Sequence, residues 1–167
     1  MAVKLRRAEP TDGEFIFLMM YEAVFWDRAD TDRPPVEEML NQDEVLPRYT
    51  TGWGRDSDEG MIAEEDGRAV GAAWFRLYTA AQPAYGFVAE GIPEIAIGMP
   101  PEERGRGAGT ALLKALLDRA KELDYRTLCL SAHRDNPAMG LYEKFGFERL
   151  ELDEEGYWTM KKDLRTH

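Results

Sequence analysis

A short stretch in the second half of the chain combines two arginines with three closely spaced glycines. Glycine lets the main chain turn tightly and brings backbone N–H groups close to a ligand, because it carries no Cβ. The arginine side chains would add charge-assisted hydrogen bonds to phosphate oxygens. An ordinary glycine-rich turn needs no arginine, so the combination favours an anion site. The stretch consists of Glu103, Arg104, Gly105, Arg106, Gly107, Ala108, Gly109 and Thr110.

The flanking sequence predicts a strand before this stretch and a helix after it. Residues 94–99 place apolar side chains at alternate positions and end at Pro100, as a strand leaving a sheet does. Over residues 108–120, apolar side chains recur every three or four positions, which lines one face of a helix. The unpaired N–H groups and the dipole at a helix N-terminus favour an anion. We therefore interpret the stretch as a phosphate-binding turn between a strand and a helix.

Two common nucleotide-binding motifs do not fit this stretch. A P-loop has Lys and then Ser or Thr after its last glycine, whereas Thr110 and Ala111 follow here. A dinucleotide-binding fingerprint has the spacing G-x-G-x-x-G, whereas these glycines occupy every second position. Hydrolysis of a nucleotide is therefore disfavoured.

The stretch instead resembles motif A of the GNAT N-acetyltransferase superfamily, Q/R-x-x-G-x-G/A, which Arg104, Gly107 and Gly109 match. Residues 136–147, with the sequence NPAMGLYEKFGF, resemble motif B of the same superfamily. Between the two motifs, residues 127–132 form an apolar strand pattern where the family has its fifth strand. The order and the spacing of all three agree with the family, and the flanks agree more loosely.

The resemblance implies an α/β fold made by residues 1–167 as a single GNAT-like domain. Its central sheet would be mixed and mostly antiparallel, with six to seven strands, a splay between strands 4 and 5, and helices on both faces. The implied co-substrate is acetyl-CoA, whose pyrophosphate would bind the glycine-rich stretch. Its pantetheine arm would run beside Ile97, Gly98 and Met99 on the fourth strand and touch Asn136, which would also cap the following helix.

The implied reaction is acetyl transfer from the thioester to a primary amine by direct attack. Tyr142 in motif B is the expected general acid, because a phenol with a pKa near 10 stays protonated at neutral pH and can donate to a thiolate. The alternative for Tyr142 is a ring that only packs under the sheet. A base is useful because an alkylammonium is rarely neutral at pH 7. Glu94 and Glu90 are the candidates, and strand alternation alone does not say which side chains of the fourth strand face the acceptor.

Histidine and cysteine add little to this chemistry. His133 follows the predicted fifth strand and could titrate near neutral pH, although a lone loop histidine is more often inert. No metal site is expected, because His133, His167 and Cys129 show no ligand spacing. Cys129 lies in an apolar run and is expected to be a buried thiol, which fits a reducing compartment and a cytoplasmic protein.

The remaining segments predict the elements that complete such a fold. Residues 85–88 are ambiguous between a short strand and a pocket-lining loop, and residues 46–55 are expected to form a loop with aromatic side chains. The predicted elements are a first strand at 3–8, a helix at 11–26, a helix starting near 36, a hairpin of 61–65 and 69–77, and a closing hairpin of 147–152 and 157–161.

The first predicted helix and the acidic segment after it bear on the acceptor. The helix is rich in aromatic and methionine side chains, most of which are expected in the core. In the family, this helix and the next loop form one wall of the acceptor pocket. Residues 27–44 carry seven acidic side chains against two arginines. Such a run is usually a solvated surface, but beside the acceptor pocket it would favour a small cationic amine. Tyr49 and Trp53 would either cover the pocket or form a separate hydrophobic cluster.

The formal net charge of −11 opposes general binding to nucleic acid or to anionic membranes. The resemblance implies acetyl-CoA and a small amine as partners, and a homodimer through the first helix or the closing hairpin is left open. A non-catalytic acyl-CoA-binding or sensor module is the alternative function, since no unmistakable base is present. A nucleotide-binding regulator is a third and weaker hypothesis.

Overall fold

A seven-stranded sheet with the strand order β1-β2-β3-β4-β5-β7-β6 forms the centre of the computed structural model. The structure describes residues 3–28 and 30–164, so His167 lies outside the described residues. Among the described residues, no helix is long and apolar enough to cross a membrane. The strands are β1 (Lys4–Arg7), β2 (Glu59–Glu65), β3 (Arg68–Arg76), β4 (Glu94–Gly98), β5 (Thr127–His133), β6 (Glu148–Leu152) and β7 (Tyr157–Asp163), and the α-helices are α1 (Gly13–Val24), α2 (Ala108–Glu122) and α3 (Met139–Lys144).

Neighbouring strands are antiparallel except β4 and β5, which run parallel and pair only where Glu94 faces Cys129. The Cys129 N–H donates to the carbonyl of Pro93 at 3.0 Å, just before β4 begins. Beyond this point the two strands diverge, which leaves the edge of β4 without a neighbouring strand over residues 95–98. The predicted splay between the fourth and fifth strands is confirmed.

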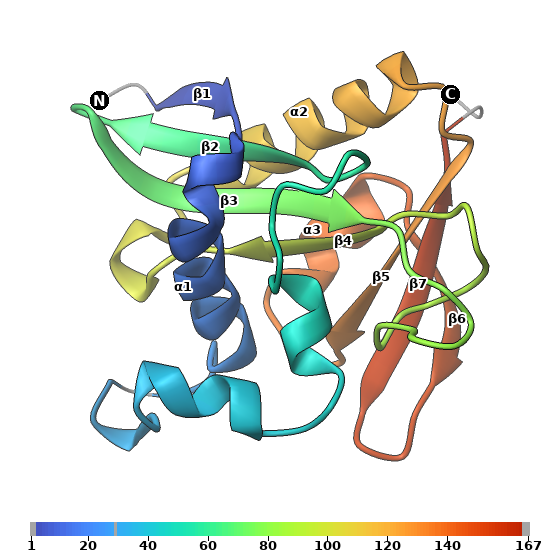
Figure 1. Ribbon diagram of the computed structural model, residues 1–167, viewed down its shortest axis with the longest axis horizontal. Helices are drawn as coiled ribbons and strands as arrows, with labels where there is room; N and C mark the ends of the chain where they lie inside the picture. The colour runs from blue at the N-terminus through green and yellow to red at the C-terminus, as the bar shows by residue number, and fades with distance from the viewer. Residues whose placement is uncertain (1–2, 29, 165–167) are drawn as a thin grey trace.

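The helices cover the two faces of the sheet, so each face has its own hydrophobic core. Helix α2 lies behind β2 and β3 in Figure 1, and its buried Leu112, Leu113 and Leu116 belong to the same hydrophobic cluster as Tyr142 of α3. Helix α1 crosses the front of the sheet and contacts β4, and the residues buried there include Ile16 and Trp74. Alternation along β4 divides its side chains between these two cores.

The predicted elements occur at their expected places with three corrections. The first helix ends at Val24 and not at residue 26. The segment starting at Val36 is a 3-10 helix, η3 (Val36–Asn41), followed by a second one, η4 (Leu46–Tyr49). Asn136 does not cap α3, because the helix N-cap is Ala138. The Oδ1 atom of Asn136 instead accepts the Ala138 N–H at 2.9 Å. This hydrogen bond forms an Asx-turn before the helix begins.

The predicted β2–β3 hairpin forms, and the ambiguous segment 85–88 is a loop. The hairpin of β2 and β3 turns at Asp66 and Gly67, both with positive φ, as the Asp-Gly pair predicts. Residues 85–88 form no strand. They belong to the loop between β3 and β4, and the N–H of Gly86 donates to the carboxylate of Glu94 at 3.1 Å. This loop therefore lies against the start of β4.

Candidate functional site

The glycine-rich turn leads directly into α2, as its sequence indicates. Gly107 is the helix N-cap with φ 89°, and Gly105 has φ 76°. These conformations favour glycine, because a Cβ is strained there. A Cβ built on either glycine would meet no other group of the described protein within 4 Å. The turn therefore presents main chain to open space at the N-terminus of a 15-residue helix, where the first N–H groups have no acceptor within the helix.

The two arginines of the turn are held by the protein itself. The guanidinium of Arg104 donates to the carbonyls of Met99 at 3.3 Å, Trp26 at 3.0 Å and Glu22 at 3.3 Å. It thereby ties the turn to the end of α1. Burial lowers the pKa of Arg104. Its side chain still lines the groove described next, so its charge lies beside any ligand there.

Arg106, unlike Arg104, does not line that groove and pairs with acidic side chains instead. Its guanidinium pairs with Glu103 at 3.0 Å and with Glu65 at 3.3 Å. Arg106 and the buried Ala108 are the two residues of the predicted cofactor site that do not line the groove. The main chain of the turn and Arg104 are thus better placed than Arg106 to meet a phosphate.

A groove of about 370 Å³ runs from this turn along the free edge of β4 to the start of α3. Its walls are formed by the glycine-rich turn, by β4 where it diverges from β5, and by the segment before α3. The predicted cofactor residues that line it are Ile97, Gly98, Met99, Arg104, Gly105, Gly107, Gly109, Thr110 and Asn136. The sequence motifs, which are about 30 residues apart, therefore meet in one continuous groove. Its exposed edge amides and the helix N-terminus fit an amide-containing arm and a pyrophosphate.

A second cavity, of about 300 Å³, opens between α1, the 3-10 helices and the β6–β7 hairpin. We call it the acceptor pocket, because the family resemblance predicts the acceptor beside the first helix. Trp26, Ile97, Asn136 and Tyr142 line both this pocket and the groove. These shared residues mark the junction of the two cavities. An arm lying in the groove can therefore present its end to a molecule in the acceptor pocket.

Tyr142 lies at this junction. Its ring packs edge-on against Phe147 at a centroid distance of 6.1 Å, and the residue is only 8% exposed. Burial raises the pKa of its phenol to about 12. The phenol therefore remains protonated throughout the neutral range and can act only as a proton donor there.

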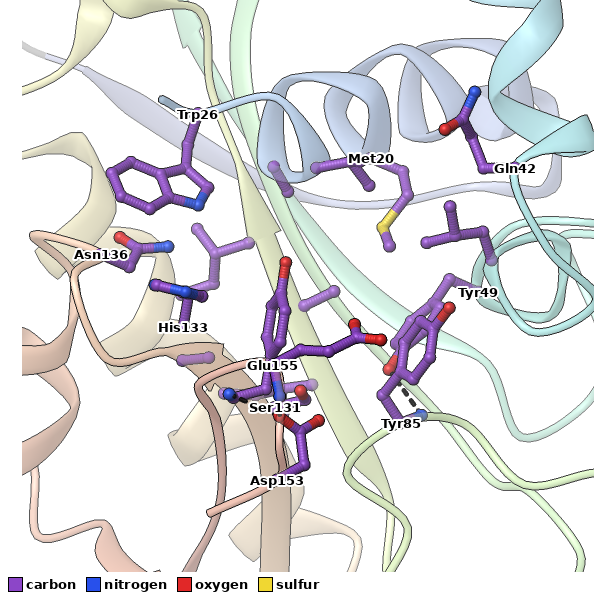
Figure 2. A pocket seen from close by; sticks show the side chains of 18 of the residues that line it. Met20, Trp26, Gln42, Tyr49, Tyr85, Ser131, His133, Asn136, Asp153 and Glu155 are labelled. Carbon is purple, nitrogen blue, oxygen red and sulfur yellow. Dashed lines mark hydrogen bonds between the residues drawn. The ribbon is translucent and has the colours of Figure 1, made fainter. Parts of the chain in front are cut away.

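The walls of the acceptor pocket are aromatic and acidic. Figure 2 shows Trp26, His133 and Asn136 together on one side of the pocket and Tyr49 and Tyr85 on the other. The ring of His133 also stacks edge-on with Tyr157 at 5.0 Å. Tyr85 belongs to the segment for which the sequence left a pocket-lining loop open, and it lines the pocket. The sequence did not identify Tyr157, Asp153 or Glu155 as pocket residues, because the pairing of β5 with β7 brings them there.

Three carboxylates and no lysine or arginine occur among the described residues that line the acceptor pocket. Asp43 comes from the segment between the 3-10 helices, and Asp153 and Glu155 come from the turn between β6 and β7. Figure 2 shows the Glu155 side chain extending across the pocket toward the wall of Tyr49 and Tyr85. The pocket is therefore electronegative and lined with ring faces, which suits a cation.

Glu94 lies on the α1 face of β4, so its side chain is on the acceptor side of the strand. It is 1% exposed, and its Oε2 accepts hydrogen bonds from the Tyr49 hydroxyl and from the Gly86 N–H. Its Oε1 is buried with no hydrogen-bond partner in residues 3–28 and 30–164. Burial raises the pKa of the carboxyl to about 7, against the lowering effect of its two hydrogen bonds.

Glu94 does not itself line the acceptor pocket, whereas Tyr49 does. The other candidate base, Glu90, is exposed, and its carboxylate accepts the N–H of Ala80 at 2.9 Å, away from both cavities. Among the described residues, no group of three or more His, Cys, Asp and Glu side chains could hold a metal ion. Cys129 is fully buried, and burial raises the pKa of its thiol.

Comparison with known proteins gives concordant results. The family model for the acetyltransferase (GNAT) family matches residues 21–147. A mycothiol acetyltransferase from Sanguibacter keddieii is 31% identical over 153 residues, which are 90% of this chain and 45% of the relative. The chain thus spans less than half the length of that relative.

Two solved structures show the same fold. The paia N-acetyltransferase of Thermoplasma acidophilum, solved with coenzyme A, has a TM-score of 0.64 at 18% identity and covers 98% of this chain and 99% of its own. A phosphinothricin acetyltransferase from Sinorhizobium meliloti, solved with acetyl-CoA, has a TM-score of 0.66 at 22% identity, over 98% of this chain and 89% of its own.

Proposed function

Since the chain belongs to the acetyltransferase (GNAT) family, we propose that residues 1–167 form an acetyl-CoA-dependent N-acetyltransferase domain that acts on a small cationic amine. The observation that carries this proposal is the junction of the groove and the acceptor pocket at Tyr142. Two cavities that meet beside one buried phenol suit a transfer from a molecule in one to a molecule in the other. Relatives solved with coenzyme A or acetyl-CoA support the choice of donor.

The protein contributes positioning and a proton donor to this reaction. The N-terminus of α2 and Arg104 would hold the pyrophosphate, and the free edge of β4 would bind the pantetheine amides. The main-chain N–H groups of Ile97 or Met99 would polarise the thioester carbonyl. Acetyl-CoA supplies the activated acetyl group. As the carbon–sulfur bond breaks, Tyr142 donates its proton to the leaving sulfur.

The lining of the pocket supports the proposed class of acceptor. A cationic amine would be attracted by Asp43, Asp153 and Glu155 and would pack against the aromatic walls. Because an ammonium group cannot attack a thioester, the site must also remove a proton. Glu94 is the proposed base, since a carboxyl with a pKa of about 7 is partly ionised at neutral pH and takes up protons readily.

A titration of acetyl-CoA followed by an assay with a panel of amines tests this function. Thr110→Glu places a carboxylate in the first turn of α2, where the pyrophosphate would lie, and is expected to abolish binding measured by calorimetry. Lys114→Glu changes the charge further along the same helix, outside the groove, and should bind acetyl-CoA as the wild type does. Equal binding by both variants would contradict the assigned groove.

Release of free thiol in the presence of an amine distinguishes catalysis from the non-catalytic alternative. Cationic primary amines are expected to be acetylated, and neutral or acidic ones to be poor acceptors. Tight binding of acetyl-CoA without turnover of any amine would instead support an acyl-CoA-binding or sensor module. Tighter binding of ATP than of acetyl-CoA would support a nucleotide-binding regulator.

A further inference from the structure

Tyr49 is the group that connects the acceptor pocket with the buried Glu94. Its ring lines the pocket, while its hydroxyl donates to Glu94 Oε2 and accepts the N–H of Tyr85 at 3.1 Å. Tyr49 comes from η4, and Glu94 lies 45 residues later on β4. The pair is thus assembled by the tertiary fold, and its Tyr49 lies on one side of the pocket (Figure 2).

We propose that Tyr49 is a further catalytic residue, which carries the proton of the acceptor amine from the pocket to Glu94. This inference rests on the proposed acetyltransferase function. The geometry supports it, because Glu94 is buried and does not line the pocket, whereas Tyr49 lines the pocket and its hydroxyl is hydrogen-bonded to Glu94. A hydroxyl can accept one proton while it donates another, so a single side chain is sufficient for the transfer.

The transfer balances without any additional reagent. One N–H bond of the acceptor ammonium breaks, and its proton passes to the Tyr49 oxygen as the Tyr49 proton passes to Glu94 Oε2. The neutral amine then attacks the thioester carbon, a nitrogen–carbon bond forms, and the carbon–sulfur bond breaks. The sulfur takes the proton of Tyr142, and the second proton lost by nitrogen restores that phenol. Net release is one proton, which leaves from Glu94.

The two proton movements at Tyr49 must be concerted. Burial and the neighbouring Glu94 raise the pKa of Tyr49 well above its ordinary value, so a free phenolate is disfavoured. The aromatic wall holds the hydroxyl in place, with the Tyr78 ring at 5.8 Å and the Tyr85 ring at 6.4 Å from the Tyr49 ring. A fixed hydroxyl between donor and acceptor needs little rearrangement during the transfer.

Among the described contacts of Glu94, no lysine or arginine side chain pairs with its carboxylate. Arg76 is its register partner on β3, but the Arg76 guanidinium pairs with Asp58 at 3.0 Å and donates to carbonyls of the segment after η4. The other titratable groups that face Glu94 are Tyr78 and Cys129, and burial keeps both protonated by raising their pKa. The carboxyl therefore exchanges protons through Tyr49.

Tyr49→Phe tests the proposal, with Tyr85→Phe as the matched control from the same wall. Glu94 is followed by carbon NMR of glutamate-labelled protein, with its signal assigned from Glu94→Gln, and this titration needs no acceptor. Loss of the Tyr49 hydrogen bond, which lowers the pKa of Glu94, should move the titration midpoint of Glu94 upward. Tyr85→Phe should leave that midpoint unchanged, because the Tyr85 contact to Tyr49 is made by its main chain.

The pH dependence of kcat/KM then distinguishes two roles for Tyr49. It either relays a proton or only shifts the pKa of Glu94. If Tyr49 is a relay, the kcat/KM of Tyr49→Phe should stay about 10²-fold below that of the wild type. This deficit should persist at pH values above the shifted Glu94 midpoint, where Glu94 is fully ionised. Recovery of the wild-type rate at that plateau would overturn the relay. An unchanged Glu94 midpoint would also overturn it. Absence of turnover by the wild type would defeat the proposed function and the relay together, so the two failures are distinguishable.

Discussion

A Cβ built on Gly98 would lie 1.9 Å from the carbonyl oxygen of Met19, so β4 and α1 meet main chain to main chain. This contact holds α1 close to the strand edge at which the groove and the acceptor pocket join. Trp26, just beyond α1, lines both cavities and accepts a hydrogen bond from Arg104 through its carbonyl. The position of the acceptor wall therefore depends on a glycine in the fourth strand.

Gly98→Ala is expected to destabilise the protein by at least about 3 kcal/mol, because the added methyl group can be accommodated only by moving the backbone of α1 or β4. Gly140→Ala is the matched control. It adds the same methyl group in α3, where no heavy atom lies within 4 Å, and should be neutral or stabilising by up to about 1 kcal/mol. Urea unfolding measures both changes, and equal effects would contradict the close contact.

Tyr142→Phe should lower kcat by about 10²-fold or more and leave acetyl-CoA affinity nearly unchanged, because it removes only the proton donor from a buried ring. Stopped assays of thiol release together with calorimetry check this split. Tyr125→Phe removes a phenol that lines neither cavity and should keep the wild-type rate. A Tyr142→Phe enzyme with full activity would show that this tyrosine only packs.

Glu94 makes the stability of the protein depend on pH. Its pKa is raised from 4.5 to about 7 in the folded state, so the native protein binds this proton more tightly than the unfolded chain. The resulting stabilisation is fully present below about pH 4.5 and is lost as the pH rises through 7. It corresponds to about 3 kcal/mol. Urea unfolding at pH 5 and pH 8 should show that Glu94→Gln loses most of this dependence, and an unaltered pH profile would refute the assignment.

Glu155→Gln should raise the KM for a cationic amine about two- to fivefold, because an exposed charge at the pocket rim contributes a few tenths to about 1 kcal/mol. The effect should shrink at high salt. Glu154→Gln removes the same charge from the neighbouring position, which does not line the pocket, and should change KM little. Equal changes in the two variants would indicate a general effect of net charge and not a local one.

Arg104→Ala should reduce stability by about 1–3 kcal/mol, because it leaves three carbonyls without their charged donor. It should also weaken acetyl-CoA binding. Arg106→Ala breaks only ion pairs on a half-exposed side chain and should cost less than about 1 kcal/mol. Thermal unfolding and calorimetry compare the two variants, and a larger binding loss in Arg106→Ala would contradict the arrangement of the turn.

Much of the fold was predictable from local sequence. The glycine-rich turn, the helix after it and the strand before it lie within residues 94–122, so spacing alone indicated the order of strand, turn and helix. The Asp66-Gly67 hairpin and the closing hairpin were equally local. The prediction that Asn136 caps α3 was wrong. Its side chain accepts the N–H of Ala138, and Ala138 is itself the N-cap of the helix.

The sequence by itself thus determined the glycine-rich turn, the strand edge and the position of the tyrosine of α3, because each is encoded by neighbours in the chain. The tertiary structure decided which groups these elements meet. The β4 and β5 strands diverge after Glu94, and the pairing of β5 with β7 carries Asp153 and Glu155 to the acceptor pocket. Tyr49 reaches Glu94 across 45 residues, and Arg104 reaches Trp26 across 78. Periodicity cannot indicate such contacts, because they depend on the order in which the strands assemble and not on the spacing within any one of them.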